Sequence, residues 1–181
     1  MTERASEPAG TAAAIDRLVR NAARYAGPFR YAAAGVRPAL QVTVLTCMDA
    51  RIDPARLLGL EPGDAHVLRN AGGVVTPDAR RSLAISQRLL GTRAVALIRH
   101  TGCGMLGLTE AFADGLAAEV GTRPDWPVHG FADLEAGVRE ALDVLRADPF
   151  LPHTDQIHGF VYDVATGRLQ ELRDDLTERA A

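Results

Sequence analysis

Short apolar runs alternate along the chain with segments of helical periodicity, and this alternation is the feature that most constrains the fold. The clearest run is Ala94–Ile98, which is apolar on both faces, and Leu40–Leu45 is a short run rich in β-branched residues. A weaker run, His66–Leu68, lies between them. Strands buried on both faces are typical of parallel sheets, whose crossover connections are usually helices. The pattern predicts an α/β fold with a mostly parallel central sheet flanked by helices.

The segments between these runs carry helix signals. Apolar residues at helical spacing predict an amphipathic N-terminal helix that stops at Gly27-Pro28. Thr76-Pro77 is typical of a helix start, and that helix should end at Gly91. Further helices are expected from just after Gly104 to about Val120, and from Phe131 to Leu145. Near the C-terminus, Gly159–Val164 and Arg168–Leu172 read as a hairpin.

Length and charge narrow the class of protein. A chain of 181 residues fits a single domain, 1–181, in which 1–38 form the N-terminal helix and linker and 174–181 a polar tail. A formal net charge of −3 gives no general attraction to nucleic acid or to an anionic membrane. No stretch approaches the ~20 apolar residues of a membrane span, and the first twenty residues lack a signal-peptide pattern. We expect a cytoplasmic protein.

The chain has two cysteines, Cys47 and Cys103. Their number alone is compatible with a disulfide, two buried thiols or a metal pair, although a structural disulfide is rare in the cytoplasm. Cys47 follows the first apolar run, and Cys103 follows Ala94–Ile98 with His100 three residues before it. Adjacent parallel strands would bring all three to one sheet edge. Two thiolates and an imidazole suit zinc and leave a fourth position open, which is typical of catalytic sites.

A carboxylate and a guanidinium accompany the first cysteine. Asp49 is two residues after Cys47, so it can reach the same metal, and Arg51 can hold that carboxylate with two hydrogen bonds. Each residue taken singly is more often a buried thiol or a surface group. A redox switch, in which the two cysteines form a disulfide and no metal binds, therefore stays open at this point.

Three segments carry a family resemblance: Cys47–Arg51 (CMDAR), Arg69–Gly73 (RNAGG) and His100–Gly104 (HTGCG). Together they resemble the signatures of the β-class carbonic anhydrases, and of its short actinobacterial members most of all, over roughly Val42–Leu172. The resemblance implies reversible hydration of CO2 to bicarbonate and a proton by zinc-bound hydroxide. It implies one Zn²⁺ per chain, with the ligands Cys47, His100 and Cys103.

Further roles follow from the resemblance. Asp49 and Arg51 match the catalytic dyad, and Asp49 would be a fourth zinc ligand only in a closed state. Gly104 would offer its backbone N–H to bicarbonate. The family's smallest functional unit is a dimer with its active sites at the interface, so we expect a homodimer or homotetramer whose N-terminal helix packs on a partner subunit. No nucleic-acid or membrane partner is expected.

The substrate pocket should be small and apolar, and Val74 and Val75 are its candidate lining residues. His66, His129 or buffer could carry the proton away. The chain departs from the family's usual pattern at four positions, none of them a ligand: Met48 and Ala50 in place of serines, Arg99 in place of glycine, and Gly102 in place of aspartate.

Two alternatives share the predicted fold and zinc site. One is a hydrolase of carbonyl sulfide or carbon disulfide, since fold and site do not fix the substrate. The other is a non-catalytic, zinc-bound dimer that senses bicarbonate or serves as a scaffold, with Asp49 closing the site permanently.

Overall fold

The computed structural model describes residues 11–173 and divides into two compact units, the first ending at Ala34 and the second beginning at Gly35. The first unit contains helix α1, Thr11–Ala26, which ends just before Gly27 as the sequence predicts. Its apolar side chains share one face, and Ile15, Leu18 and Val19 are each more than half exposed. The predicted polar tail, 174–181, lies outside the described residues.

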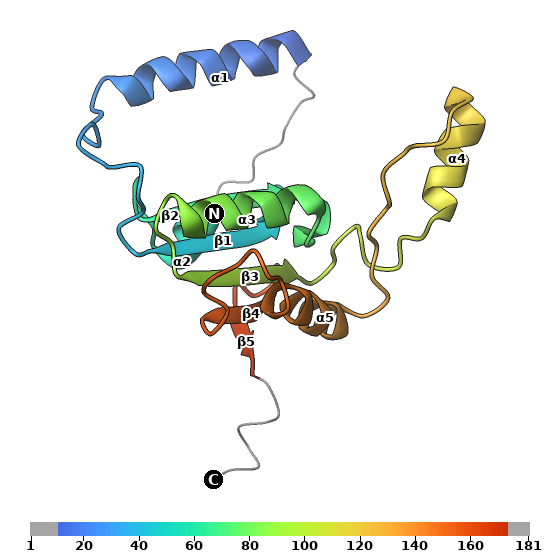
Figure 1. Ribbon diagram of the computed structural model, residues 1–181. Coiled ribbons are helices and arrows are strands. Elements are labelled where there is room, and N and C mark those ends of the chain that lie inside the picture. Colours follow the sequence, from blue (N-terminus) through green and yellow to red (C-terminus); the bar gives the residue numbers. More distant parts are fainter. Residues whose placement is uncertain (1–10, 174–181) are drawn as a thin grey trace. The chain divides into compact units, whose positions relative to one another are not determined.

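The second unit is built on a five-stranded sheet with the order β2-β1-β3-β4-β5 (Figure 1). Its strands are β1 Val42–Cys47, β2 Ala65–Asn70, β3 Ala94–His100, β4 Ile157–Tyr162 and β5 Leu169–Leu172. The first four strands are parallel, and only β5 runs antiparallel to its neighbour β4. This arrangement confirms the predicted α/β fold, its mostly parallel sheet and the C-terminal hairpin.

Several helices of this unit begin or end at residues that capping rules favour. They are α2 Pro54–Leu58, η1 Ala71–Gly73, α3 Pro77–Arg88, α4 Ala111–Val120 and α5 Leu134–Arg146. The Thr76 hydroxyl accepts a hydrogen bond from the Ala79 N–H, which satisfies a free donor of the first turn of α3. The Asp133 side chain does the same for α5 through the N–H of Ala136. Gly121, in the left-handed conformation, ends α4.

The predicted helix after Gly104 is wrong in its first part, because 101–110 forms turns and α4 begins only at Ala111. A parallel bridge pairs Leu106 with Phe131, and the Gly107 N–H donates to the Phe131 carbonyl at 2.8 Å. These contacts between distant segments satisfy the backbone that a helix would otherwise satisfy locally. For the same reason Phe131 lies before α5 rather than on its first turn.

Helices α3 and α5 bury the main core against the sheet. Its members include Leu45 and Leu97 from the sheet, Leu83 from α3, and Val138 and Leu142 from α5. The sheet is thereby held rigidly, and the carboxyl ends of β1 and β3 lie side by side, since Thr46 pairs with Ile98. Within the described residues, no helix is long and apolar enough to cross a membrane.

Candidate metal centre

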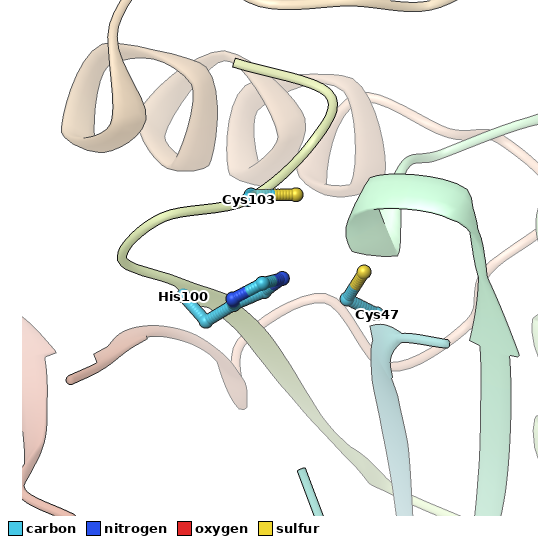
Figure 2. A group of neighbouring side chains, drawn as sticks. All are labelled: Cys47, His100 and Cys103. Atoms are coloured by element: carbon cyan, nitrogen blue, oxygen red, sulfur yellow. The ribbon is translucent and has the colours of Figure 1, made fainter. Parts of the chain in front are cut away.

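Three potential metal ligands meet where β1 and β3 end (Figure 2). Cys47 is the last residue of β1, His100 is the last residue of β3, and Cys103 lies in the turn that follows. Their two sulfur atoms and one imidazole nitrogen all lie within 4.8 Å of one another. All three residues are buried, and the two cysteines are free thiols. The structure therefore brings together the cluster that the sequence predicts.

The imidazole of His100 is held in an orientation that suits metal binding. Its Nδ1 lies 3.0 Å from the Thr101 carbonyl oxygen, to which it donates a hydrogen bond, so Nε2 carries the lone pair. Burial lowers the pKa of His100, which favours the neutral ring. Nε2 is itself buried and has no hydrogen-bond partner. A buried polar atom without a partner is costly, and a cation placed among these ligands would remove that cost.

A tight backbone turn positions Cys47. The Gly72 N–H donates a hydrogen bond to the Cys47 sulfur at 3.3 Å. Gly72 has φ 82° and Gly73 has φ 60°, the left-handed region that favours glycine. A Cβ on Gly73 would also lie 3.0 Å from the backbone carbon of Thr46. The paired glycines thus allow η1 to approach the end of β1 closely enough to stabilise a thiolate.

The electrostatics of the two thiols favour a cation between them. Burial raises the pKa of the Cys103 thiol, and the neighbouring Cys47 raises it further. Two buried thiolates repel each other unless a positive charge compensates them. Zinc is the ion that two thiolates and one imidazole suit, and these three residues would hold it. The donor set, its burial and the unpartnered Nε2 all fit that metal.

Asp49 and Arg51 form an ion pair beside the cluster. The guanidinium Nε donates to Asp49 Oδ1 at 2.9 Å and Nη2 donates to Oδ2 at 2.7 Å, while the Arg51 N–H also reaches Oδ1 at 2.9 Å. These bonds hold the pKa of the Asp49 carboxyl far below its usual range. Oδ2 lies 3.8 Å from His100 Nε2. A permanently charged carboxylate therefore adjoins the position that a metal would take.

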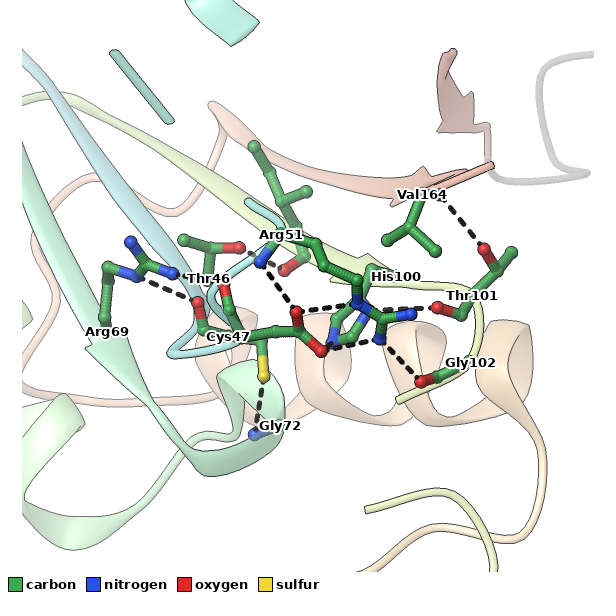
Figure 3. A network of polar contacts seen from close by, with 11 residues as sticks. Thr46, Cys47, Arg51, Arg69, Gly72, His100, Thr101, Gly102 and Val164 are labelled. Carbon is green, nitrogen blue, oxygen red and sulfur yellow. Dashed lines mark hydrogen bonds and ion pairs between the residues drawn. The ribbon is translucent and has the colours of Figure 1, made fainter. Parts of the chain in front are cut away.

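Two further residues hold Asp49 and Arg51 in place, and the sequence pattern predicts this role for neither of them. Arg51 Nη2 also donates to the carbonyl of Gly102 at 2.9 Å, and Gly102 has φ 61°. Arg69 donates from Nε to the Cys47 carbonyl at 2.9 Å (Figure 3). It also donates from Nη2 to the Asp49 carbonyl at 2.7 Å. Arg69 lies in the RNAGG segment that carries part of the family resemblance, but its contacts depend on the pairing of β1 with β2.

The two valines proposed for the substrate pocket both line a cavity of about 210 Å³ beside Arg99, but they differ in their other contacts. Val74 packs in the same small core cluster as Cys47 and Cys103, and it lines an apolar cavity of about 430 Å³ together with Met48 and Met105. Val75 instead packs against the main core. Gly104 is exposed, with open space beside its Cα.

The two candidate proton carriers lie at different places. His129 lines the same apolar cavity as Val74. His66 pairs with Thr43 near the start of β1, four residues before Cys47. Because a strand rises about 3.3 Å per residue, His66 is roughly 13 Å along the sheet from the cluster. The structure therefore does not bring His66 to the candidate metal centre.

A buried Cys-His-Cys cluster that could hold a metal ion lies at the strand ends of an α/β sheet. Comparisons with known proteins identify the family. The family model described as carbonic anhydrase matches residues 42–126. A β-carbonic anhydrase of Mycobacterium tuberculosis is 48% identical over 136 residues, which cover 75% of this chain and 83% of that protein. A carbon disulfide hydrolase of an Acidianus species is 35% identical over 153 residues, covering 71% of this chain and 75% of that protein.

A solved structure of a carbonic anhydrase is also similar to this chain. The crystal structure of a carbonic anhydrase from Streptococcus mutans superposes with a TM-score of 0.82 at 38% sequence identity, covering 88% of this chain and 97% of that chain. The chain belongs to the β-carbonic anhydrase family.

Proposed function

We propose that the protein catalyses the zinc-dependent, reversible hydration of CO2 to bicarbonate and a proton, with one Zn²⁺ per chain. The observation that carries this proposal is the buried cluster of Cys47, His100 and Cys103, with its unpartnered imidazole nitrogen, in a chain that is 48% identical to a β-carbonic anhydrase. When bound, zinc would supply a Lewis acid that makes water a nucleophile near neutral pH.

Three buried residues of the protein would bind the metal. Cys47 and Cys103 would contribute two negative charges, and His100 a neutral nitrogen fixed by its bond to Thr101. Two thiolates donate more charge than two imidazoles, so bound water should be less acidic than at a three-histidine site. Activity that rises above neutral pH is the expected consequence.

Asp49 and Arg51 would orient the reactants. Oδ1 of Asp49 accepts two hydrogen bonds from Arg51 and Oδ2 accepts one, so Oδ2 keeps a lone pair that can accept a further hydrogen bond. Asp49 would accept the hydrogen of the attacking water and so direct the water's lone pair at the carbon of CO2. Because the pKa of Asp49 is held so low, it would not keep the proton. The closed state, with Asp49 on the metal, would require it to leave Arg51.

The apolar cavity at Val74 is the proposed route for CO2, and Val75 would contribute through the neighbouring cavity that it lines together with Val74. Gly104 would donate its backbone N–H to bicarbonate from the open side of the turn. His129, which lines that cavity, is the better placed of the two histidines to pass the proton to buffer.

We also propose that the chain acts as a single functional domain in a homodimer or homotetramer. The exposed apolar face of α1 supports this, because an apolar stripe on a helix is stable only when another surface covers it. In the proposed dimer, α1 packs on the partner subunit.

Hydrolysis of carbon disulfide is the second candidate, favoured by the 35% identity to the Acidianus enzyme. The same ligands and the same dyad would serve, so the site does not separate the two substrates. Measuring CO2 hydration and sulfide release on one preparation would do so. We expect hydration to dominate, because identity to the mycobacterial carbonic anhydrase is higher.

Metal analysis combined with stopped-flow CO2 hydration tests the main proposal. The purified protein should contain about one zinc per chain. Cys47→Ser should lose both zinc and hydration, while Thr43→Ser, a matched change four residues earlier on β1, should keep both. A zinc-free Cys47→Ser protein with full activity would contradict the proposal.

The same measurements separate the two non-catalytic alternatives. Bound zinc with background hydration at every pH would favour the bicarbonate sensor or scaffold. A disulfide between the two cysteines, with no bound metal, would favour the redox switch.

A further inference from the structure

The side chain of Asn70 clamps the turn that approaches Cys47. Its Oδ1 accepts a hydrogen bond from the Val74 N–H, and its Nδ2 donates to the Val74 carbonyl, both at 2.8 Å. The two bonds join the first and last residues of the segment 70–74, much as an exchanged pair of peptide hydrogen bonds joins two strands. Asn70 thereby fixes how closely the end of β2 and the residue after η1 approach each other.

Both ends of this segment are also anchored to the rest of the fold. At the first end, Asn70 pairs with Cys47 across the sheet, and the Asn70 carbonyl accepts a hydrogen bond from the Met48 N–H at 2.9 Å. At the other end, the Val74 side chain is buried in the small core cluster that contains Cys47 and Cys103. The amide of Asn70 ties these two anchors together across the turn.

The clamped turn delivers one N–H group to the metal centre. The buried Gly72 donates its N–H to the Cys47 sulfur at 3.3 Å (Figure 3). One side of the turn is tightly packed, since a Cβ added to Gly72 would lie 3.0 Å from Met105 Cγ. The direction of this N–H group therefore depends on where the two ends of the turn are held.

We propose that Asn70 is a positioning residue of the metal centre, which acts through the Gly72 N–H to set how much charge the Cys47 sulfur donates to the metal. An N–H group that donates to a metal-bound thiolate withdraws electron density from the sulfur and holds the ligand in its binding orientation. The inference rests on the metal binding that the proposed function requires, but it does not depend on the reaction.

Gln87 provides a matched comparison elsewhere in the fold. Its side-chain amide forms the same pair of bonds with a single residue, donating to the His153 carbonyl at 2.9 Å and accepting from the His153 N–H at 3.1 Å. Gln87 is buried on α3. Because its bonds lead to His153 rather than to a metal ligand, removing them measures the cost of losing an amide clamp alone.

Cobalt substitution and chelator competition for zinc in Asn70→Ala and Gln87→Ala test the proposal. Both changes should lower the midpoint of chemical denaturation. Only Asn70→Ala should move the thiolate-to-cobalt charge-transfer band to lower energy, because the released sulfur donates more charge to the metal. Asn70→Ala should also weaken zinc binding about ten- to a hundredfold, the usual effect of losing a group that supports a metal ligand. Gln87→Ala should keep the wild-type band and the wild-type zinc affinity.

Two results would overturn the proposal: a cobalt band and a zinc affinity that Asn70→Ala leaves unchanged, or equal changes in both variants, which would make the role of Asn70 structural only. A wild-type measurement covers the case in which Asn70→Ala does not fold. In protein loaded with NMR-active cadmium, the Gly72 amide proton should show scalar coupling to the metal through the sulfur, and its absence would contradict the proposal. A shifted band in Asn70→Ala together with background hydration in the wild type would support this inference and count only against the proposed reaction.

Discussion

Two buried polar regions share strand β1, and they are satisfied in opposite ways. Near the start of β1, the Thr43, Ser86 and Thr92 hydroxyls lie within 2.7 to 3.3 Å of one another, and His66 Nδ1 lies 2.7 Å from Ser86 Oγ. At the end of β1, four residues on, Cys47 faces a cluster in which His100 Nε2 has no partner.

The difference separates a structural network from a functional site. Each of the three hydroxyls at the start of the strand has partners within the chain, so this network needs nothing from outside. At the other end, two thiol sulfurs and one imidazole nitrogen lie within 4.8 Å of one another, and the nitrogen has no hydrogen-bond partner. Burial and polarity are the same in both regions. The unmet bonding capacity, rather than the residue types alone, marks the metal centre.

The largest expected effect comes from removing the carboxylate beside the cluster. Asp49→Ala should retain about one zinc per chain, because the three ligands are untouched, and should lower kcat for hydration on the order of 10²- to 10⁴-fold. Asp78→Ala, which removes an exposed carboxylate on α3, is the matched control. Zinc content and stopped-flow rates measure the outcome. Near-normal turnover in Asp49→Ala would remove Asp49 from the proposed dyad.

A smaller effect concerns pH. Burial raises the pKa of the Cys103 thiol, so the proton-bound form is favoured until the pH rises above that pKa. Since zinc must displace this proton, apparent zinc affinity should increase with pH, on the order of tenfold per unit for each thiol proton released. Chelator competition between about pH 6 and 9 measures it. Ser86→Ala should show the same slope, and a flat profile in the wild type would mean that the thiols bind no metal.

The smallest effect is expected at the structural network. Ser86→Ala should leave zinc content and turnover unchanged and reduce the free energy of unfolding by about 1–3 kcal/mol, because the hydroxyls of Thr43 and Thr92 lose a buried partner. Ser82→Ala, on the same helix and with a partly exposed side chain, is the control. Chemical denaturation of both variants gives the difference. A loss of zinc in Ser86→Ala would show that the two regions are coupled.

Much of the fold follows from local signals. The strands containing Leu45 and Leu97 are mostly apolar and buried, and Thr76-Pro77 and Gly121 mark helix ends through hydrogen-bonding rules that act within a few residues. Helix α2 carries the same kind of signal and was missed: Asp53 caps it, Pro54 is its first residue, and Gly59 ends it in the left-handed conformation. Its five residues are too few to show the helical periodicity of apolar residues.

Other parts depend on partners far along the chain. The turns of 101–110 replace the predicted helix because Leu106 pairs with Phe131. Arg69 contacts the Cys47 and Asp49 carbonyls only because β2 lies beside β1. No pattern near Arg99 indicates that its guanidinium lies over Phe131 and against Gly137.

The sequence by itself determined the α/β class, and it indicated the three candidate metal ligands and the neighbouring Asp-x-Arg pair, because strand ends and ligand spacing are local properties. Only the tertiary structure decided which polar groups remain unpaired. That property depends on every neighbour of a side chain in space. The Ser86 hydroxyl has hydrogen-bond partners, whereas His100 Nε2 and the Nε and Nη1 atoms of Arg99 have none among the described residues. Unsatisfied bonding capacity is therefore visible only once the chain has folded.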